Sequence, residues 1–375
     1  MAEVRVSYTH TEDQELIRST ARQFLTERFG METVRDLMMS DEGFDKAHFK
    51  EMTDLGWTGL AIAESHGGTG LGPVELGVLL EEMGRLVTPG PFFASAVLAT
   101  SVIKEVGTPD DHTRLLPRLA SGEIIATVAL FDNARGWALR PQTRAVKDGN
   151  RWSLSGTKRA VLDAGLADLV LVTAADGDDV SLFAVDPDAS GVTITPESVL
   201  DPTRRQATVD LDGVVVTTDD RIGIGDATPG LTKAHRLATV ALASEQVGGA
   251  QAAMDMAVGY AKSRYQFGRP IGSYQSIKHR CANMLMKVEH ARSTAYYGAR
   301  VTYEDDELAV AAPLAGSVCS EAYTWVAGEN IQVHGGIGFT WEHDAHLYLK
   351  RAKASSLLLG SPRYQRDLLG RAIGI

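Results

Sequence analysis

Hydrophobic positions near the start of the chain recur with the period of an α-helix. Ile17, Ala21 and Leu25 share one helical face. Thr11 and Gln14, three positions apart, form a capping-box pattern, which predicts where this helix begins. The first part of the chain is therefore expected to be helical.

The pattern then changes twice. Short β-branched runs such as IIATVALF, DLVLVTA and VSLFAV alternate with turn signals such as Asp148-Gly149, which predicts antiparallel strands. The helical period returns in long segments that extend to the end of the chain. This order predicts an α+β fold with an N-terminal helical domain (1–122), a middle antiparallel β domain (123–229) and a C-terminal helical domain (230–375).

Composition narrows the functional class. The 375 residues include 37 Lys and Arg against 48 Asp and Glu, and the net charge of −11 disfavours nucleic acid or an anionic membrane as the main partner. Cys281 and Cys319 lack the spacing of a disulfide framework or a zinc site. His343 and His346 have no evident third metal ligand. No apolar run is long enough to span a bilayer, so we expect a cytoplasmic protein without a metal.

Two segments of the third region combine polar, aromatic and glycine residues. In YAKSRYQFGRPIGSYQ, Arg264 precedes Gln266 and Phe267, and a guanidinium and an amide beside a ring could hold a pyrophosphate and cover an apolar cofactor face. A charged helix end followed by a turn explains the same residues. In IQVHGGIGFT, glycines would let backbone approach a ligand and polar side chains would bind it: Gln332, His334, Gly335, Gly336. By itself this segment also fits a helix stop.

Together these segments resemble the acyl-CoA dehydrogenase family, and the resemblance covers nearly the whole chain. It includes LGWTGLAIAESHGGTGLG at 55–72, RYQFGRPIGSYQSIKH at 264–279 and QVHGGIGF at 332–339. The resemblance implies a tetramer with a C-terminal four-helix domain, in which FAD oxidises an acyl-CoA thioester at its α and β carbons and an electron-transferring flavoprotein accepts the electrons. It also implies that one subunit holds its neighbour's FAD through these residues: Arg264, Gln266, Phe267, Gln275, Gln332, His334, Gly335 and Gly336.

The family reaction needs a carboxylate base, and this chain departs from the family pattern there. Most members carry a Glu in a C-terminal YEGT-type motif, and the register of the motifs above places Leu359 at that position. Some relatives carry the base on the preceding long helix, where this chain has Ala238. Glu245 lies two helical turns further along the same face, about 10.5 Å away. It could be the base, or a buried carboxylate with a structural partner.

The family's contacts to the flavin ring within one chain also differ. They come from a TEPxxGSD-type loop and a WIT-type tripeptide, which correspond here to LFDNARGWA at 130–138 and KRAVLD at 158–163, with Ala160 and Leu162 replacing Trp and Thr. We therefore expect a base-lacking subunit of an α₂β₂ acyl-CoA dehydrogenase of actinobacterial type, which acts on bulky thioesters such as steroid side chains. The alternatives are a homomeric dehydrogenase that uses Glu245 or another unorthodox base, a noncatalytic structural partner, and a flavin-dependent hydroxylase.

Overall fold

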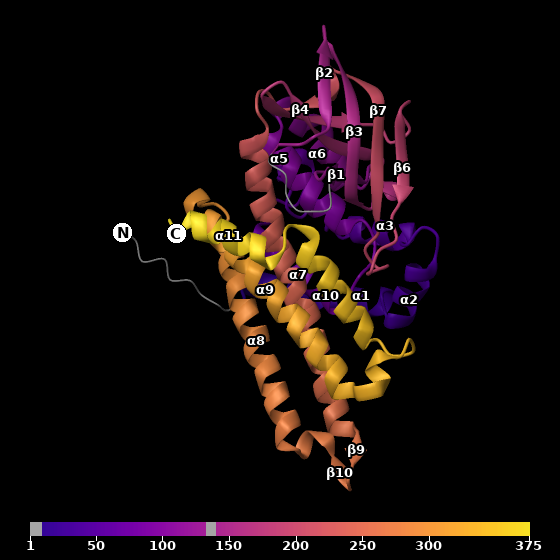
Figure 1. Cartoon of the computed structure of the whole chain (residues 1–375), viewed down its shortest axis with the longest axis vertical. Helices are drawn as coiled ribbons and strands as arrows, with labels where there is room; N and C mark the ends of the chain where they lie inside the picture. The colour runs from indigo at the N-terminus through magenta and orange to yellow at the C-terminus, as the bar shows by residue number, and fades with distance from the viewer. Residues whose placement is uncertain (1–9, 133–139) are drawn as a thin grey trace.

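The computed structural model describes residues 10–132 and 140–375, in which the β-sheet lies at one end of the molecule, beside N-terminal helices and away from the far tip of the C-terminal helices (Figure 1). Thr11 and Gln14 form the predicted capping box, from which the first helix begins. The N-terminal helices are α1 (Glu12–Arg28), α2 (Met31–Met39), α3 (Lys46–Asp54), α4 (Pro73–Arg85), α5 (Thr100–Val106) and α6 (Pro109–Ala120), with a π-helical segment, η2 (Phe93–Ala99), before α5.

The middle of the chain forms an eight-stranded sheet in the described residues, in the order β6-β7-β3-β2-β4-β5-β8, and β1 also pairs with β4. Its strands are β1 (Ala126–Ala129), β2 (Arg144–Asp148), β3 (Arg151–Leu162), β4 (Leu169–Asp176), β5 (Asp179–Val185), β6 (Val192–Pro196), β7 (Gln206–Thr217) and β8 (Arg221–Ile222). Most neighbours are antiparallel, as expected, whereas β4 pairs in parallel with β1 and β2.

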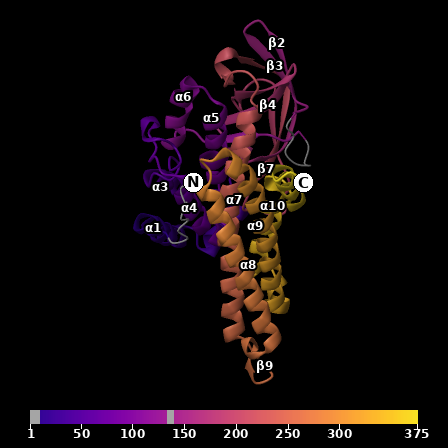
Figure 2. The same ribbon diagram turned by 90° about the vertical axis from the view of Figure 1, so that its left-hand side faces the viewer.

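Long helices dominate the rest of the chain and form a bundle that extends away from the sheet (Figure 2). They are α7 (Thr228–Ser263), α8 (Gln275–Arg300), α9 (Asp305–His334), α10 (Ala345–Leu358) and α11 (Pro362–Ala372). A small hairpin between α7 and α8, made of β9 (Tyr265–Gln266) and β10 (Arg269–Pro270), lies at the far tip of the bundle (Figure 1). Among the described residues, no helix is both long and apolar enough to cross a membrane.

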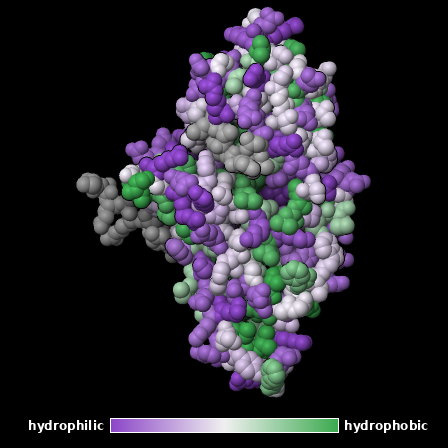
Figure 3. Space-filling view, in the orientation of Figure 1, coloured by the Kyte–Doolittle hydropathy of each residue, from purple (hydrophilic) through white to green (hydrophobic). Residues whose placement is uncertain are grey.

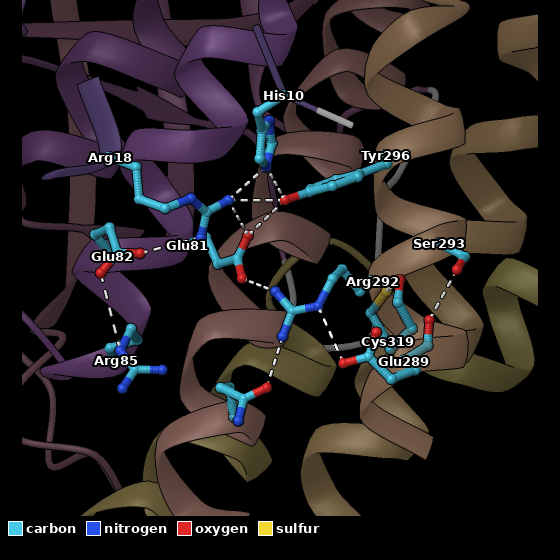
Figure 4. A network of polar contacts seen from close by, with 12 residues as sticks. His10, Arg18, Glu81, Glu82, Arg85, Glu289, Arg292, Ser293, Tyr296 and Cys319 are labelled. Atoms are coloured by element: carbon cyan, nitrogen blue, oxygen red, sulfur yellow. Dashed lines mark hydrogen bonds and ion pairs between the residues drawn. The ribbon is translucent and has the colours of Figure 1, made fainter. Parts of the chain in front are cut away.

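Helices α4 and α7 pack closely because glycines lie at their contact. A Cβ on Gly84 would collide with the backbone oxygen of Glu245, and one on Gly248 would collide with that of Glu81. Figure 4 shows Arg18 from α1 and Arg292 from α8 pointing toward the Glu81 carboxylate. The N-terminal domain and the bundle are thus joined by backbone contact and by buried ion pairs.

Candidate functional site

The hairpin at the tip of the bundle has a strained turn. Its strands pair Gln266 with Arg269, which leaves Phe267 and Gly268 as a two-residue loop with φ of 51° and 79°. Two such positive φ angles are the requirement of a type I′ turn, for which Asn-Gly is the usual sequence. Phe267 is strained in this region and its side chain is 92% exposed. Strained, exposed residues of this kind gather at binding sites, where contact with a ligand offsets their cost.

Arg264 lies at the C-terminal end of α7, beside this turn. It is exposed, and its guanidinium makes no hydrogen bond or ion pair with any described residue. Gln266 is also exposed. Gln275 is the first residue of α8, and its amide nitrogen lies 2.9 Å from Nε2 of His279. Three of the predicted cofactor contacts therefore lie near one another in sequence and are exposed, although the Gln266 amide donates to the Tyr265 carbonyl oxygen at 2.9 Å and the Gln275 amide contacts His279.

The end of α9 lies at the same end of the bundle. The His334 ring packs 4.3 Å from the rings of Tyr260 on α7 and His343, and Nδ1 lies 2.8 Å from the Asn330 carbonyl oxygen. Burial lowers the pKa of His334. Gly335 has a φ of 64°, and a Cβ there would meet only open space. The structure thus brings the two predicted segments together, but it buries His334 beneath them.

The same end of the molecule exposes large apolar side chains. Figure 3 shows hydrophobic residues reaching the surface at the lower end of the bundle. Besides Phe267, the large apolar side chains exposed in or next to these segments are Tyr265, Ile337, Phe339 and Trp341. Apolar residues gathered next to a free guanidinium are typical of a surface that another molecule covers.

Leu359, where the family pattern places the base, is held firmly in the interior. It is 2% exposed and follows the last residue of α10. His235 donates from Nε2 to the Leu359 carbonyl oxygen at 2.8 Å, and Gln365 donates to the same oxygen at 2.7 Å. Burial lowers the pKa of His235 to about 4, so its imidazole is neutral near pH 7. This loop presents no proton acceptor that titrates near neutrality.

Glu245 lies in a buried network of ion pairs. Its carboxylate forms ion pairs with Arg204 at 2.5 Å and with Arg351 at 2.9 Å. Arg351 also forms an ion pair with Asp201 at 2.6 Å. Burial would raise the pKa of Glu245, but the guanidiniums of Arg204 and Arg351 outweigh it and lower that pKa. A general base in a dry pocket needs the opposite shift. The geometry therefore favours the structural alternative over the base.

The other hydrogen bonds of Arg351 reach residues after α4 and before β7. Its Nη2 donates to the carbonyl oxygens of Val87 and Thr88 beyond α4, and to the hydroxyl of Thr203 in the loop before β7. Because Glu245 belongs to α7, this single guanidinium connects the N-terminal domain, the sheet and the bundle. No pattern in the sequence singled out Arg351.

Asp163 is the described carboxyl group whose pKa is raised, to about 6, and burial is the main cause. It follows β3 in a left-handed conformation, with a φ of 48°. Its pKa suits a general base, but it does not line any of the hollows considered below. Among the described residues, Asp163 is therefore a buried carboxyl group outside both hollows.

A cavity of about 630 Å³ lies between the sheet and α10. Ala160 lines it from β3, and Glu197, Gln206 and Leu358 are among the other lining residues. Most of LFDNARGWA, the other predicted ring contact, lies outside the described residues. The Ala160 N–H, the donor at the predicted flavin-ring position, already donates to Glu197 Oε1 at 3.3 Å.

A second hollow, of about 610 Å³, lies between α7, α9 and α11. Its lining includes His235, Tyr364 and two arginines, Arg236 and Arg371, and no carboxylate among the described residues. Neither guanidinium makes a hydrogen bond or ion pair with a described residue. The hollow is therefore suited to an anionic ligand.

Comparison with known proteins places this architecture in one family. Models of the acyl-CoA dehydrogenase N-terminal, middle and C-terminal domains match residues 11–123, 135–212 and 233–374. The acyl-CoA dehydrogenase IpdE2 of Mycolicibacterium smegmatis is 33% identical over 95% of this chain and 97% of its own. FadE34 of Mycobacterium tuberculosis is 35% identical over 94% of this chain and 46% of its own.

Solved structures agree. A variant of the Tcur3481-Tcur3483 steroid ACAD has a TM-score of 0.86 and 32% identity, covering 97% of this chain and 98% of its own. The ChsE4-ChsE5 complex from Mycobacterium tuberculosis has a TM-score of 0.90 and 27% identity, covering 98% and 99%. The chain belongs to the acyl-CoA dehydrogenase family. It is an FAD-dependent oxidoreductase that acts on an acyl-CoA thioester, and the expected α+β fold is confirmed.

Proposed function

We propose that this chain is the base-lacking subunit of a heteromeric acyl-CoA dehydrogenase and that it holds the FAD of a partner subunit. The observation that carries the proposal is that neither candidate base position offers a free carboxylate. Leu359 is a buried aliphatic side chain, and Glu245 is bound by two guanidiniums. A partner subunit must then supply the carboxylate that removes the α-proton.

The tip of the bundle supplies what such a partner needs. Arg264 and the amides of Gln266 and Gln275 would bind the FAD pyrophosphate and adenosine, and Phe267 would cover an apolar face. Gln332, Gly335 and Gly336 would extend this clamp, with His334 as its buried support. Bound FAD supplies the acceptor for the hydride that leaves the β-carbon. The chain's own residues bind and orient that group.

The relatives support the assembly and the substrate class. One is described as a steroid ACAD and another as a complex of two differently named chains. We infer an α₂β₂ assembly with a homologous subunit that carries the Glu, a bulky ring-bearing acyl-CoA as substrate, and an electron-transferring flavoprotein as electron acceptor.

The test compares the chain alone with the chain coexpressed with a Glu-bearing homologue. Alone, it should purify with little flavin and no dehydrogenase activity. Together, the two chains should copurify with visible flavin absorbance and reduce an artificial acceptor when given an acyl-CoA. A lone chain that holds stoichiometric FAD and oxidises an acyl-CoA would contradict the proposal.

The hollow that contains Arg236 and Arg371 could bind a CoA thioester within this chain, which a second candidate, a homomeric dehydrogenase, requires. CoA carries several phosphates, and two free guanidiniums in a hollow without carboxylates would bind them. In that case Glu245→Gln should abolish turnover without releasing flavin. Under our proposal the same variant acts by destabilising the fold, so its loss of activity follows its loss of folded protein.

A further inference from the structure

We propose that Glu197 closes this chain's own flavin cradle, so that FAD is bound at the partner's cradle instead. The inference rests on the proposed function, because it explains how a chain that keeps a complete clamp avoids loading FAD itself. Copies of the chain could otherwise clamp one another's FAD through Arg264 and Phe267. Under the proposed function, a feature of the cradle must therefore prevent FAD from binding to copies of this chain alone.

The first observation is that the backbone N–H of Ala160 lies in an irregular part of the sheet. The pairing of β3 with β7 is irregular between Lys158 and Val161, so the intervening residues form a bulge. Ala160, in that bulge, has a φ of 52°. A bulge turns backbone donors away from the ladder and is a common way to present them to a ligand. The Ala160 N–H therefore belongs to the cavity wall, as does Ala160 itself.

The second observation is that the Glu197 carboxylate accepts the hydrogen bond of the Ala160 N–H. Glu197 follows β6, and its own N–H donates to the Gln206 carbonyl oxygen at 2.9 Å, which fixes its backbone on β7. The Thr208 hydroxyl donates to Glu197 Oε1 at 2.6 Å, and Ala160 N–H donates to the same oxygen at 3.3 Å. The carboxylate thus reaches across β7 to the bulge on β3.

The chemistry of a carboxylate makes this contact unfavourable for FAD. The flavin ring presents carbonyl oxygens, which need donors, whereas an ionised carboxylate only accepts hydrogen bonds. Glu197 makes no direct ion pair with any described residue, and the nearest guanidinium contact runs through Thr208, whose hydroxyl receives a hydrogen bond from Arg159 at 3.4 Å. The other charged lining residues are Asp201 and Arg204, which are paired within the buried network, and Lys353. Glu197 therefore occupies a backbone donor and adds a carboxylate without a direct ion pair to the cavity wall.

The test measures FAD binding by the lone chain. Variants Glu197→Ala, Glu197→Gln and Thr208→Val are compared with wild type and with Asp212→Ala, which removes an exposed carboxylate of the same domain. FAD dissociation constants come from flavin fluorescence, and the rise in melting temperature with excess FAD gives an independent readout. Circular dichroism checks that each variant is folded.

Glu197→Ala should bind FAD about tenfold tighter or better, the effect of one regained donor and one removed charge. Glu197→Gln should gain less, because its amide oxygen can still accept from Ala160. Thr208→Val should also gain less, since it only releases the carboxylate, and Asp212→Ala should match wild type. If Glu197→Ala misfolds, the Gln and Val variants decide the question.

Folded variants that bind FAD no better than wild type would overturn the role of Glu197 and leave the heteromeric proposal intact. Stoichiometric FAD and acyl-CoA oxidation by the wild-type chain alone would overturn both. The two failures are therefore distinguishable in one set of purified proteins.

Discussion

Two regions of this molecule differ in how many of their polar groups have hydrogen-bond or ion-pair partners. One is the interior around Leu359 and Glu245, and the other is the tip of the bundle. Around Leu359 and Glu245, each charged or polar group described above has a partner within the chain. At the tip of the bundle, the Arg264 guanidinium has no partner among residues 10–132 and 140–375, and Phe267 is 92% exposed on a strained backbone. The charged groups around Glu245 are therefore paired within the chain, whereas the side chains at the tip are exposed.

This difference shows how a site can lose a role without losing its fold. Under the proposed function, Leu359 stands where relatives carry a carboxylate, and an apolar side chain in this buried setting costs little. Keeping a free guanidinium and an exposed ring at the tip gives the isolated chain no stability, so their presence points to a ligand.

The largest effect is expected at Arg351. Arg351→Met leaves the carboxylates of Glu245 and Asp201 buried without their shared cation, which should lower the free energy of unfolding by about 3–5 kcal/mol. Urea unfolding of the lone chain measures it. Arg363 is exposed on α11 and makes no side-chain hydrogen bond or ion pair with a described residue, so it supplies the control: Arg363→Met should stay within about 0.5 kcal/mol of wild type.

An Arg351→Met protein as stable as wild type would show that the network is not what holds the interior together. The interior carboxylates would then tolerate being unpaired, and the contrast between a paired interior and an exposed tip would have no effect on stability.

The next effect concerns pH and His235. Its folded-state pKa of about 4 lies below the ordinary value of 6.5, so its stabilising contribution is full above pH 6.5 and is lost as the pH falls toward 4. The loss amounts to about 3 kcal/mol. His235→Gln keeps a donor for the Leu359 carbonyl oxygen but does not titrate. Its free energy of unfolding should therefore fall less than that of wild type across this window.

Asp163 acts in the opposite direction over part of the same window, because its raised pKa of about 6 means that protonation stabilises the fold as the pH drops. Its contribution is present in both proteins and cancels in the difference. Parallel pH curves for wild type and His235→Gln would contradict a buried neutral imidazole at this position.

Much of the fold follows from local patterns. The capping box at Thr11, the long apolar periods of the bundle and the β-branched runs of the sheet all predicted elements that formed. The parallel pairings of β4 were not predictable, because which strands become neighbours depends on contacts between segments far apart in sequence.

The candidate site was predictable only where a motif is continuous. Arg264, Gln266 and Phe267 stand next to one another in the chain, so their pattern could be seen in the sequence. Arg204 and Arg351, the partners of Glu245, lie 41 and 106 residues away from it. Nothing in helical spacing shows whether a carboxylate on an apolar face will meet a substrate or a guanidinium.

At the tip, removal of Arg264 should weaken FAD binding. In the assembled complex, Arg264→Ala deletes a charged hydrogen bond worth about 1.5–3 kcal/mol, which is a loss of affinity of about tenfold to a hundredfold. Lys262→Ala, on the exposed end of α7, is the matched control for charge and should retain FAD. Flavin released on dilution measures both. Equal retention by the two variants would place the pyrophosphate elsewhere.

The smallest effect should have opposite signs in the two settings. Phe267→Asn places a residue that tolerates positive φ in the first position of the hairpin turn, so the lone chain should gain about 0.5–1 kcal/mol of stability. Little packing is lost, because the ring is almost fully exposed. In the complex the same change removes the ring that covers FAD, so flavin should dissociate faster. Urea unfolding of the lone chain and flavin release from the complex measure the two effects. A gain in stability without faster release would show that the strain at Phe267 serves something other than FAD.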